Sequence, residues 1–283
     1  RYWVGGGSGT NWSDVGNTNW SATSGGANNA SVPTSTDNVY FDGNSGVGTS
    51  VISANITIRS INCTGYAGTL QHNAAVILSI GDSTPGASYI ALKMVPGMTY
   101  TLGDAITSAI TFISSSATAQ TVDFAGKTTG NITFNNASGV WKFVGVHITD
   151  ATATVTLTTG TIDTNSQTVS WGHFISAAGT LRLFASSVAL TGVGTVWNAA
   201  GLTISSNTST ISVTDATVAA KTFAGAGKTT YNNVVFSGDN ISITGANTFL
   251  GTFSVNNVGL PNGLKLTNGV TQTLTLFANN GAL

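Results

Sequence analysis

The chain has 283 residues, of which 41% are hydrophobic and only 7% are charged, and its ten acidic residues include no glutamate. Since an ordinary soluble domain carries roughly a quarter charged residues, most of the polar surface must consist of Thr, Ser, Asn and Gly. The apolar content supports a continuous core and excludes a disordered chain. A formal net charge of −1, without a basic run, excludes nucleic acid and anionic lipid as electrostatic partners.

Cysteine use and hydropathy exclude two further classes of protein. Cys63 is the only cysteine, so no intrachain disulfide forms and the chain is not a disulfide-stapled scaffold. The longest apolar stretch, residues 74–80, is too short to cross a bilayer, so we predict no membrane insertion. Because the chain begins with Arg1 rather than Met, we expect a trimmed N-terminus with neighbouring domains outside this sequence.

Residues 1–45 form a Trp- and Gly-rich segment with its own composition. Trp3, Trp12 and Trp20, half of the six tryptophans, lie there beside a glycine run at positions 5–7. Two interpretations are open: the indoles close the open end of a repetitive core, or they form a sugar-stacking surface. We predict an N-terminal cap over residues 1–45, followed by a repetitive solenoid over residues 46–283.

From about residue 50 onward the sequence contains short triplets in which two apolar residues flank a middle residue that is polar in every triplet but one, where it is Ala189. Alternation with a period of two buries one face of a strand and exposes the other. Clusters of Gly, Asn, Asp and Ser between the triplets favour tight turns. The triplets begin at Ile56, Ile110, Val122, Ile132, Val155, Leu181, Val188, Leu202, Ile211, Ile241, Phe253, Leu264 and Leu274.

The chain also resembles itself over a longer distance. Residues 124–134 are similar to residues 226–236, and residues 157–160 to residues 266–269, a shift of about one hundred positions. In a strand-rich chain such repetition predicts a solenoid or a propeller, with solenoid coils of about 20 to 25 residues. No blade signature supports a propeller. We therefore predict an all-β, right-handed parallel β-helix, with a β-sandwich array as the alternative.

Several stretches carry a resemblance to known proteins. They are residues 2–6, 11–12, 19–21, 32–33 and 37–42 near the N-terminus, and residues 156–165 and 167–169 later on. They resemble repetitive β-solenoid surface proteins, both autotransporter-associated strand repeats and fibre-like or spike-like virion proteins of tailed bacteriophages. The resemblance covers nearly the whole chain through compositional motifs. It implies an exported or virion-surface structural role and transfers no catalytic residues.

The repeated Gly-Lys-Thr-Thr sequence invites comparison with a phosphate-binding loop. It begins at Gly126 and again at Gly227. A phosphate-binding loop also requires a glycine five positions earlier, where this chain has Thr121 and Thr222. The residues that follow are patterned as strands, so no helix N-terminus is available for phosphate. We interpret both repeats as coil turns.

Paired carboxylates would indicate glycoside hydrolysis, and only aspartate is available for that role. Asp123 and Asp163 lie in strand-like segments and could point outward from adjacent coils. Asp150, Asp215 and Asp239 end strands, where aspartate commonly caps turns. The basic residues are too scattered to supply the base of a lyase. We predict no catalytic residues and no enzymatic activity.

The histidines and oxygen-bearing side chains do not form a metal-binding pattern. His72, His147 and His173 lack metal-ligand spacing. His147 lies between two apolar residues, so we expect it to face solvent. Asp42, Asn44 and residues 163–165 could supply oxygen ligands for calcium, but no full loop pattern is present. We predict no metal site and no cofactor.

Three tryptophans lie in the repetitive region. Trp141 shares its strand parity with Phe143, which indicates a core position, and Trp197 lies in a separate coil region. Trp171 is close to His173, and these two residues could form an exposed platform for a sugar ring, while buried packing of the indole is the alternative. Trp171 and His173 are our predicted glycan-contact residues.

These observations predict a non-enzymatic structural or adhesive protein of a virion surface, such as a tailed-phage fibre, spike or decoration protein. One alternative is a bacterial cell-surface adhesin or surface-layer component, and a second is a glycan-cleaving tailspike. We expect the protein on a virion surface, or outside the cell on the cell surface. The expected partners are other virion or surface proteins, cell-surface glycan and further copies of the chain in a homo-oligomer.

Overall fold

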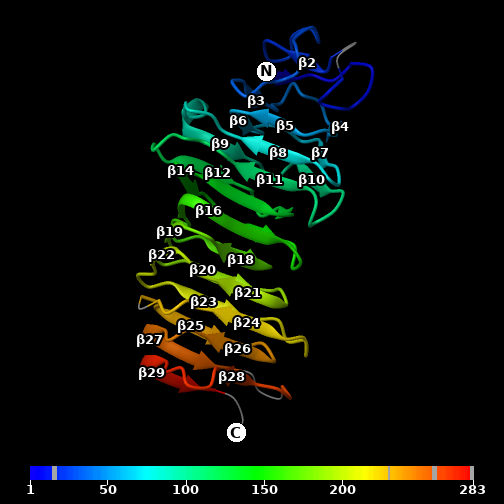
Figure 1. Cartoon of the computed structure of the whole chain (residues 1–283). Helices are drawn as coiled ribbons and strands as arrows, with labels where there is room; N and C mark the ends of the chain where they lie inside the picture. Colours follow the sequence, from blue (N-terminus) through cyan, green and yellow to red (C-terminus); the bar gives the residue numbers. More distant parts are fainter. Residues whose placement is uncertain (15–17, 229, 257–259, 281–283) are drawn as a thin grey trace. The chain divides into compact units, whose positions relative to one another are not determined.

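The computed structural model describes residues 1–14, 18–228, 230–256 and 260–280, and it is all-β (Figure 1). Mostly parallel strands stack into a β-helix of about ten turns. The one helical element among the described residues is a single turn, η1 (Ala87–Tyr89), so none of their helices is long and apolar enough to cross a membrane. The predicted parallel β-helix is confirmed, and a sandwich is wrong because stacked strands pair in parallel between coils.

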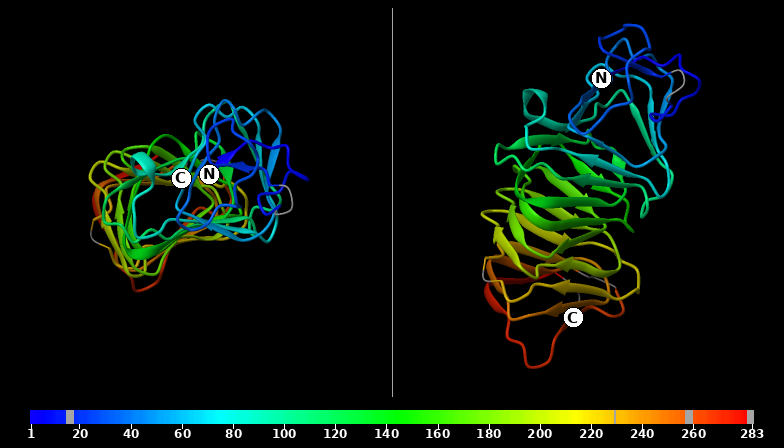
Figure 2. Two further views of the ribbon diagram at one scale, coloured as in Figure 1. Left: turned by 90° about the horizontal axis from the view of Figure 1, so that it is seen from above. Right: turned by 45° about the horizontal axis from the view of Figure 1, so that its top comes forward.

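The structure divides into two compact units, Arg1–His147 and Ile148–Leu283. Within each unit, strands at the same place in successive coils pair in parallel to form a column. The coils of the second unit overlie one another when viewed from above (Figure 2). The predicted boundary near residue 45 lies inside the first unit and stays a prediction.

The first unit has three columns of strands. The β9 column contains β3 (Asn38–Tyr40), β6 (Ser60–Asn62), β9 (Ile90–Lys93), β12 (Gln120–Asp123) and the end of β14 (Ile132–Phe143). A second column contains β4 (Thr49–Ile52), β7 (Thr69–His72) and β10 (Thr99–Leu102). A third contains β5 (Ile56–Ile58), β8 (Ile77–Ile80), β11 (Ala109–Phe112) and the start of β14. The short strand β13 (Thr128–Thr129) follows β12, and β15 (His147–Thr149) begins at the last residue of the unit.

The second unit also has three columns, but the described residues from Lys221 onward contribute strands to only two of them. One column contains the start of β16 (Thr154–Asp163), β18 (His173–Ser176), β21 (Gly194–Asn198), β24 (Lys221–Ala224), β26 (Ile241–Thr244) and β28 (Leu264–Leu266). Another contains the end of β16, β19 (Gly179–Arg182) and β22 (Leu202–Ser205). The third contains β17 (Thr168–Trp171), β20 (Ser187–Leu190), β23 (Thr210–Val213), β25 (Asn233–Phe236), β27 (Thr248–Val255) and β29 (Thr273–Asn279).

The core consists of inward side chains that stack from coil to coil. Phe112 and Phe134 are in register on neighbouring strands, and their ring centroids lie 4.9 Å apart. Trp197 and Phe223 in the second unit are likewise in register, with centroids 5.7 Å apart. Fully burying a large apolar side chain stabilises a fold by about 1.5–3 kcal/mol. Stacked columns of such side chains therefore hold the coils together without a disulfide.

The N-terminal tryptophans form a buried aromatic cluster. Strand β1 (Tyr2–Trp3) pairs in parallel with β3 and antiparallel with β2 (Trp20–Ser21). Trp3 and Trp12 pack edge-on against Trp20, with ring centroids 5.2 and 5.3 Å away. All three indoles are buried. These contacts agree with closure of the core, and the sugar-stacking interpretation of these rings is wrong because their faces are covered.

Asp and Asn side chains close local turns, nine of them at or just after a strand end and one, at Asn136, within β14. In each case a side-chain oxygen accepts the backbone N–H two residues further on. The pairs are Asp42/Asn44, Asn62/Thr64, Asp82/Thr84, Asp104/Ile106, Asp123/Ala125, Asn136/Ser138, Asp150/Thr152, Asp163/Asn165, Asn198/Ala200 and Asp215/Thr217. The predicted turn caps at Asp150 and Asp215 are confirmed.

The two Gly-Lys-Thr-Thr repeats fold as the same turn. Ala125 and Gly126 have φ angles of 50° and 70°, and Ala226 and Gly227 have φ angles of 56° and 69°. In both repeats the N–H of the following lysine donates to the carbonyl three residues earlier. The left-handed conformation explains the glycine in each repeat. The turn interpretation is confirmed for the described part of the repeats, while Thr229 lies outside the described residues.

Candidate functional site

The structure places Trp171 in the core. Its indole is 0% exposed and stacks on Phe174, with ring centroids 5.4 Å apart. Trp171 has the same parity on β17 as Val169, and both point inward. The predicted exposed platform at Trp171 is therefore wrong. The half-buried ring of His173 contacts the carbonyl oxygens of Ala153 and Val193 at 3.2 and 2.7 Å, and glycan contact by His173 stays a prediction.

The other two histidines are also structural. His147 is buried rather than solvent-facing, as it stacks on Phe124 at a centroid distance of 4.2 Å, and burial lowers its pKa to about 3. The ring nitrogens of His72 lie 2.9 Å from the Tyr100 hydroxyl and 3.0 Å from the Val76 carbonyl oxygen. Burial lowers the pKa of His72 to about 4 despite the hydrogen bond to Val76. Both rings are neutral at pH 7.

The acidic side chains are dispersed along the chain, and they accept hydrogen bonds from backbone N–H groups or pair with lysine and arginine side chains. Asp215 Oδ1 lies 2.7 Å from Nζ of the buried Lys221. Partial burial alone would raise the pKa of Asp215, but hydrogen bonds from Lys221 and Thr217 and the lysine charge lower it overall. The buried Asp239 accepts the backbone N–H groups of Asn262 and Gly263 from the next coil. No group of three His, Cys or Asp residues that could hold a metal occurs among the described residues.

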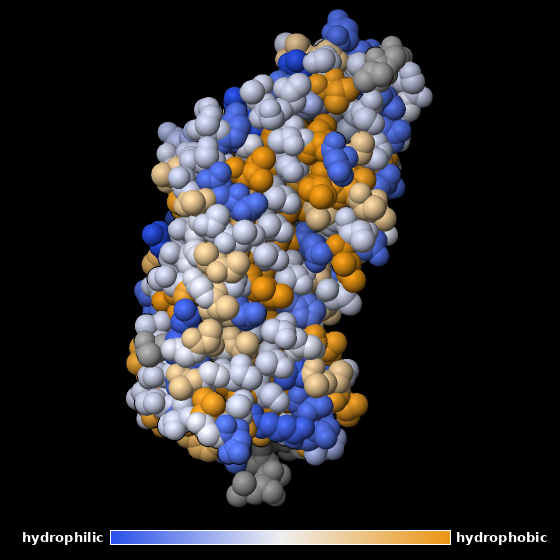
Figure 3. All heavy atoms as spheres, viewed as in Figure 1, coloured by the Kyte–Doolittle hydropathy of each residue, from blue (hydrophilic) through white to orange (hydrophobic). Residues whose placement is uncertain are grey.

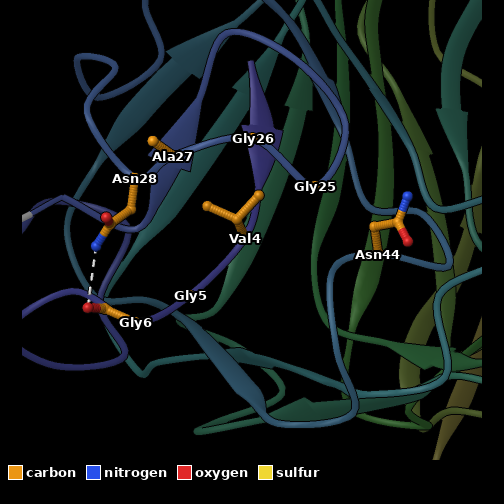
Figure 4. A pocket seen from close by; sticks show the side chains of 8 residues that line it. All are labelled: Val4, Gly5, Gly6, Gly25, Gly26, Ala27, Asn28 and Asn44. Atoms are coloured by element: carbon orange, nitrogen blue, oxygen red, sulfur yellow. Dashed lines mark hydrogen bonds between the residues drawn. The ribbon is translucent and has the colours of Figure 1, made fainter.

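A shallow depression lies beside the N-terminal tryptophan cluster. It has a volume of about 270 Å³ and is lined by Val4, Gly5, Gly6, Gly25, Gly26, Ala27, Asn28 and Asn44 (Figure 4). Its two polar side chains tie loops together: Asn28 Nδ2 donates to the Gly6 carbonyl at 3.0 Å, and Asn44 Nδ2 donates to Ser24 Oγ at 2.9 Å. None of the residues that line this depression is charged.

A second hollow, the β9–β12 groove, owes its existence to a β-bulge. Thr121 is opposite Ile90 and Asp123 is opposite Lys93, so three residue steps on β9 match two on β12. An additional residue bends a strand and redirects its neighbours. The side chains on either side of the bulge leave a groove of about 240 Å³, lined by Ile90, Lys93, Thr121, Asp123 and Val144.

The polar groups of the β9–β12 groove have free hydrogen-bonding capacity. Asp123 Oδ1 accepts the Ala125 N–H at 2.8 Å. In the part of the chain that the structure describes, neither Asp123 Oδ2 nor Lys93 Nζ has a hydrogen-bond partner. Gly145 makes room for the carboxylate, because a Cβ atom there would lie 3.1 Å from Asp123 Oδ1. The groove thus presents one acceptor and one donor of opposite charge.

Sequence reasoning considered Asp123 but not its surroundings. The groove residues come from β9, β12 and the turn after β14, which only coil stacking brings together. One sequence signal was available: residues 90–92 read Ile-Ala-Leu, three successive apolar residues that depart from period-two alternation. In the structure both Ala91 and Leu92 are buried. Such a departure is the mark of a bulge.

Comparisons with protein-family models, with curated proteins and with solved structures found no match for this chain. The features of this chain that bear on its function are therefore the coil stack, its surface and the β9–β12 groove.

Proposed function

We propose that the chain is a non-enzymatic structural and adhesive protein of a virion surface, a fibre, spike or decoration protein of a tailed phage. The observation that carries the proposal is the alternation of inward and outward side chains along the strands. Inward positions supply a continuous apolar core, and outward positions are mainly uncharged hydroxyl and amide side chains. On the face seen in Figure 3, residues of intermediate hydropathy predominate.

The physical properties of the stack support a structural role. Each coil contacts only its neighbours, so stability accumulates along the stack through repeated interfaces. The lone cysteine, Cys63, is buried, and burial raises the pKa of its thiol, which keeps it unreactive. The described coils therefore need neither a disulfide nor a redox-active thiol to persist outside a cell. We expect other virion proteins and further copies of the chain as partners.

The dispersion of the aspartates argues against glycan cleavage. Hydrolysis needs one carboxyl that donates a proton and a second that acts as base or nucleophile, held on opposite sides of one bond. Asp123, Asp150, Asp163 and Asp215 each cap a separate turn. This dispersion supports a role that does not involve glycan hydrolysis.

Localisation tests the proposal directly. Antibodies against the recombinant chain, applied with immunogold to purified phage particles and to their host cells, should label the particles. Label on uninfected cells alone would overturn the virion proposal in favour of a cell-surface adhesin. Incubation with purified host glycan should give no new reducing ends, and release abolished by Asp123→Asn would instead identify a glycan-cleaving spike.

A further inference from the structure

The β9–β12 groove combines a charge pair with unused hydrogen-bonding groups. Asp123 and Lys93 are opposite each other on neighbouring parallel strands, yet no ion pair joins them among the described residues. Carboxylate and ammonium groups that lack protein partners bind strongly to ligand hydroxyls, since charge-assisted hydrogen bonds are about twice as strong as neutral ones. The pair has no net charge, so it favours a neutral ligand rich in hydroxyl groups.

The remaining lining of the groove is suited to the less polar face of the same ligand. Ile90 and Val144 contribute apolar surface, and Val144 is 41% exposed. Between them, the Thr121 hydroxyl donates to the Tyr89 carbonyl oxygen at 3.4 Å, which leaves its oxygen lone pairs available. A sugar ring has a C–H face and a rim of hydroxyl groups. The groove offers both kinds of contact within about 240 Å³.

An exposed tyrosine immediately precedes one of the groove residues in the sequence. Tyr89 directly precedes Ile90, and its side chain is 58% exposed. The backbone at Tyr89 is strained, because Ser88 and Tyr89 both have positive φ angles, 54° and 60°. Non-glycine residues rarely adopt this conformation, and it tends to occur at functional sites. Exposed aromatic rings are the kind of surface on which sugars stack.

We propose that the β9–β12 groove binds one ring of a neutral hexopyranose oligosaccharide. Vicinal hydroxyls donate to Asp123 Oδ2 and accept from Lys93 Nζ, while the C–H face packs on Ile90 and Val144. The inference rests on the adhesive part of the proposed function and is independent of the location of the protein. No bond is made or broken in this step.

Binding to a defined panel tests the assignment. The intact chain is measured by isothermal titration calorimetry against neutral gluco-, galacto- and manno-oligosaccharides, with uronate-containing oligosaccharides for comparison. Asp123→Asn keeps the oxygen that caps the Ala125 turn but removes the charge. Asp163→Asn is the matched control, because Asp163 Oδ1 caps the same kind of turn by accepting the Asn165 N–H at 2.8 Å. Val144→Trp fills the groove, and Lys93→Met removes the donor.

The expected result is binding of at least one neutral oligosaccharide, weakened by roughly tenfold or more in Asp123→Asn, Lys93→Met and Val144→Trp and unchanged in Asp163→Asn. Absence of binding to every neutral oligosaccharide, binding that survives Val144→Trp, or preference for the uronate series would overturn the inference. Immunogold label on the particles without saccharide binding would refute the groove assignment alone. Saccharide binding with label only on cells would refute the virion proposal alone.

Discussion

The ladder around Asp123 in the first unit and the ladder around Asp163 in the second start from the same local chemistry. Each aspartate is opposite a basic residue on the neighbouring parallel strand, Lys93 in one case and Arg182 in the other. Each caps a turn by accepting the N–H two residues further on, at 2.8 Å. The ladder at Asp163 is regular over residues 161–163, whereas the ladder at Asp123 contains a bulge.

This difference shows how a groove can lie on the surface of the coil stack. A regular ladder keeps outward side chains at one spacing from coil to coil. A single additional residue in β9 separates Ile90 from Lys93 and opens a groove beside Asp123. Function in such a fold therefore depends on local departures from the repeat, while the repeat itself supplies stability.

The largest expected loss of stability comes from a charge placed in the core on the strand that carries the regular ladder. Leu157 lies on β16, the same strand as Asp163, and is fully buried. Leu157→Asp would place an unpaired charge in the apolar column and cost more than about 4 kcal/mol. Thermal unfolding followed by circular dichroism measures this loss. Thr156→Asp, at the neighbouring outward position, should cost less than about 1 kcal/mol, and equal losses in the two variants would contradict the assigned inward face.

The next largest loss of stability is expected at one of two lysines that lie near aspartates, Lys221 and not Lys93. Lys221 is buried, pairs with Asp215, and donates from Nζ to the carbonyl oxygens of Ala219 and Asp239 at 2.9 and 3.0 Å. Lys221→Met leaves these oxygens without their partner and should cost about 3–5 kcal/mol in urea unfolding. Lys93→Met should change stability by less than about 0.5 kcal/mol, and a comparable loss there would argue that Lys93 is structural.

Acid should affect the first unit more than the second. Burial holds the pKa of His72 at about 4 and that of His147 at about 3, so both rings stay neutral in the folded protein at pH 5. The unfolded chain protonates below about pH 6.5, and stability is therefore lost as pH falls from about 6.5 towards those lower values. From pH 7 to pH 5 each ring should cost about 2 kcal/mol.

Hydrogen exchange read by mass spectrometry checks this at pH 7 and 5. After correction for the intrinsic pH dependence of exchange, protection should fall in peptides around His72 and His147. It should change less in the second unit, whose one histidine is the half-buried His173. His147→Phe preserves an aromatic ring beside Phe124 and should reduce the loss by about 2 kcal/mol. Equal acid sensitivity in that variant would contradict the assignment.

The sequence predicted the parallel coil stack because each strand carries its own information. Period-two alternation marks strands such as residues 155–157, and Asp or Asn at a strand end marks the turn. Alternation alone does not decide whether an aromatic or polar residue between apolar neighbours points inward or outward. His147 looked exposed between Val146 and Ile148, but the stack on Phe124 and the contact between its Nε2 and Thr129 Oγ1 at 3.1 Å stabilise the inward orientation.

The groove could not be predicted because it depends on pairing between distant residues. Lys93 and Asp123 meet only when β9 and β12 are aligned, and the bulge that sets this alignment lies in a four-residue strand. The prediction of an exposed platform at Trp171 was wrong because the sequence does not show that the indole points inward and packs on Phe174. The composition shows which side chains are available for a groove, but the stacking register decides which of them lie side by side.

The smallest expected loss of stability concerns Gly145, which lies beside Asp123 in the groove. Gly145 has a φ of 95°, and a Cβ there would lie 3.1 Å from Asp123 Oδ1, whereas Gly126 has a φ of 70° and no atom within 4 Å of its Cβ position. Gly126→Ala adds only backbone strain, about 1 kcal/mol, while Gly145→Ala adds strain and a steric contact, about 1–2 kcal/mol. Because the contact is with one carboxylate, the double variant Gly145→Ala with Asp123→Ala should recover part of the loss in a double-mutant cycle. Strict additivity in urea unfolding would mean that Gly145 acts through its backbone alone and that the room beside Asp123 is not set by this glycine.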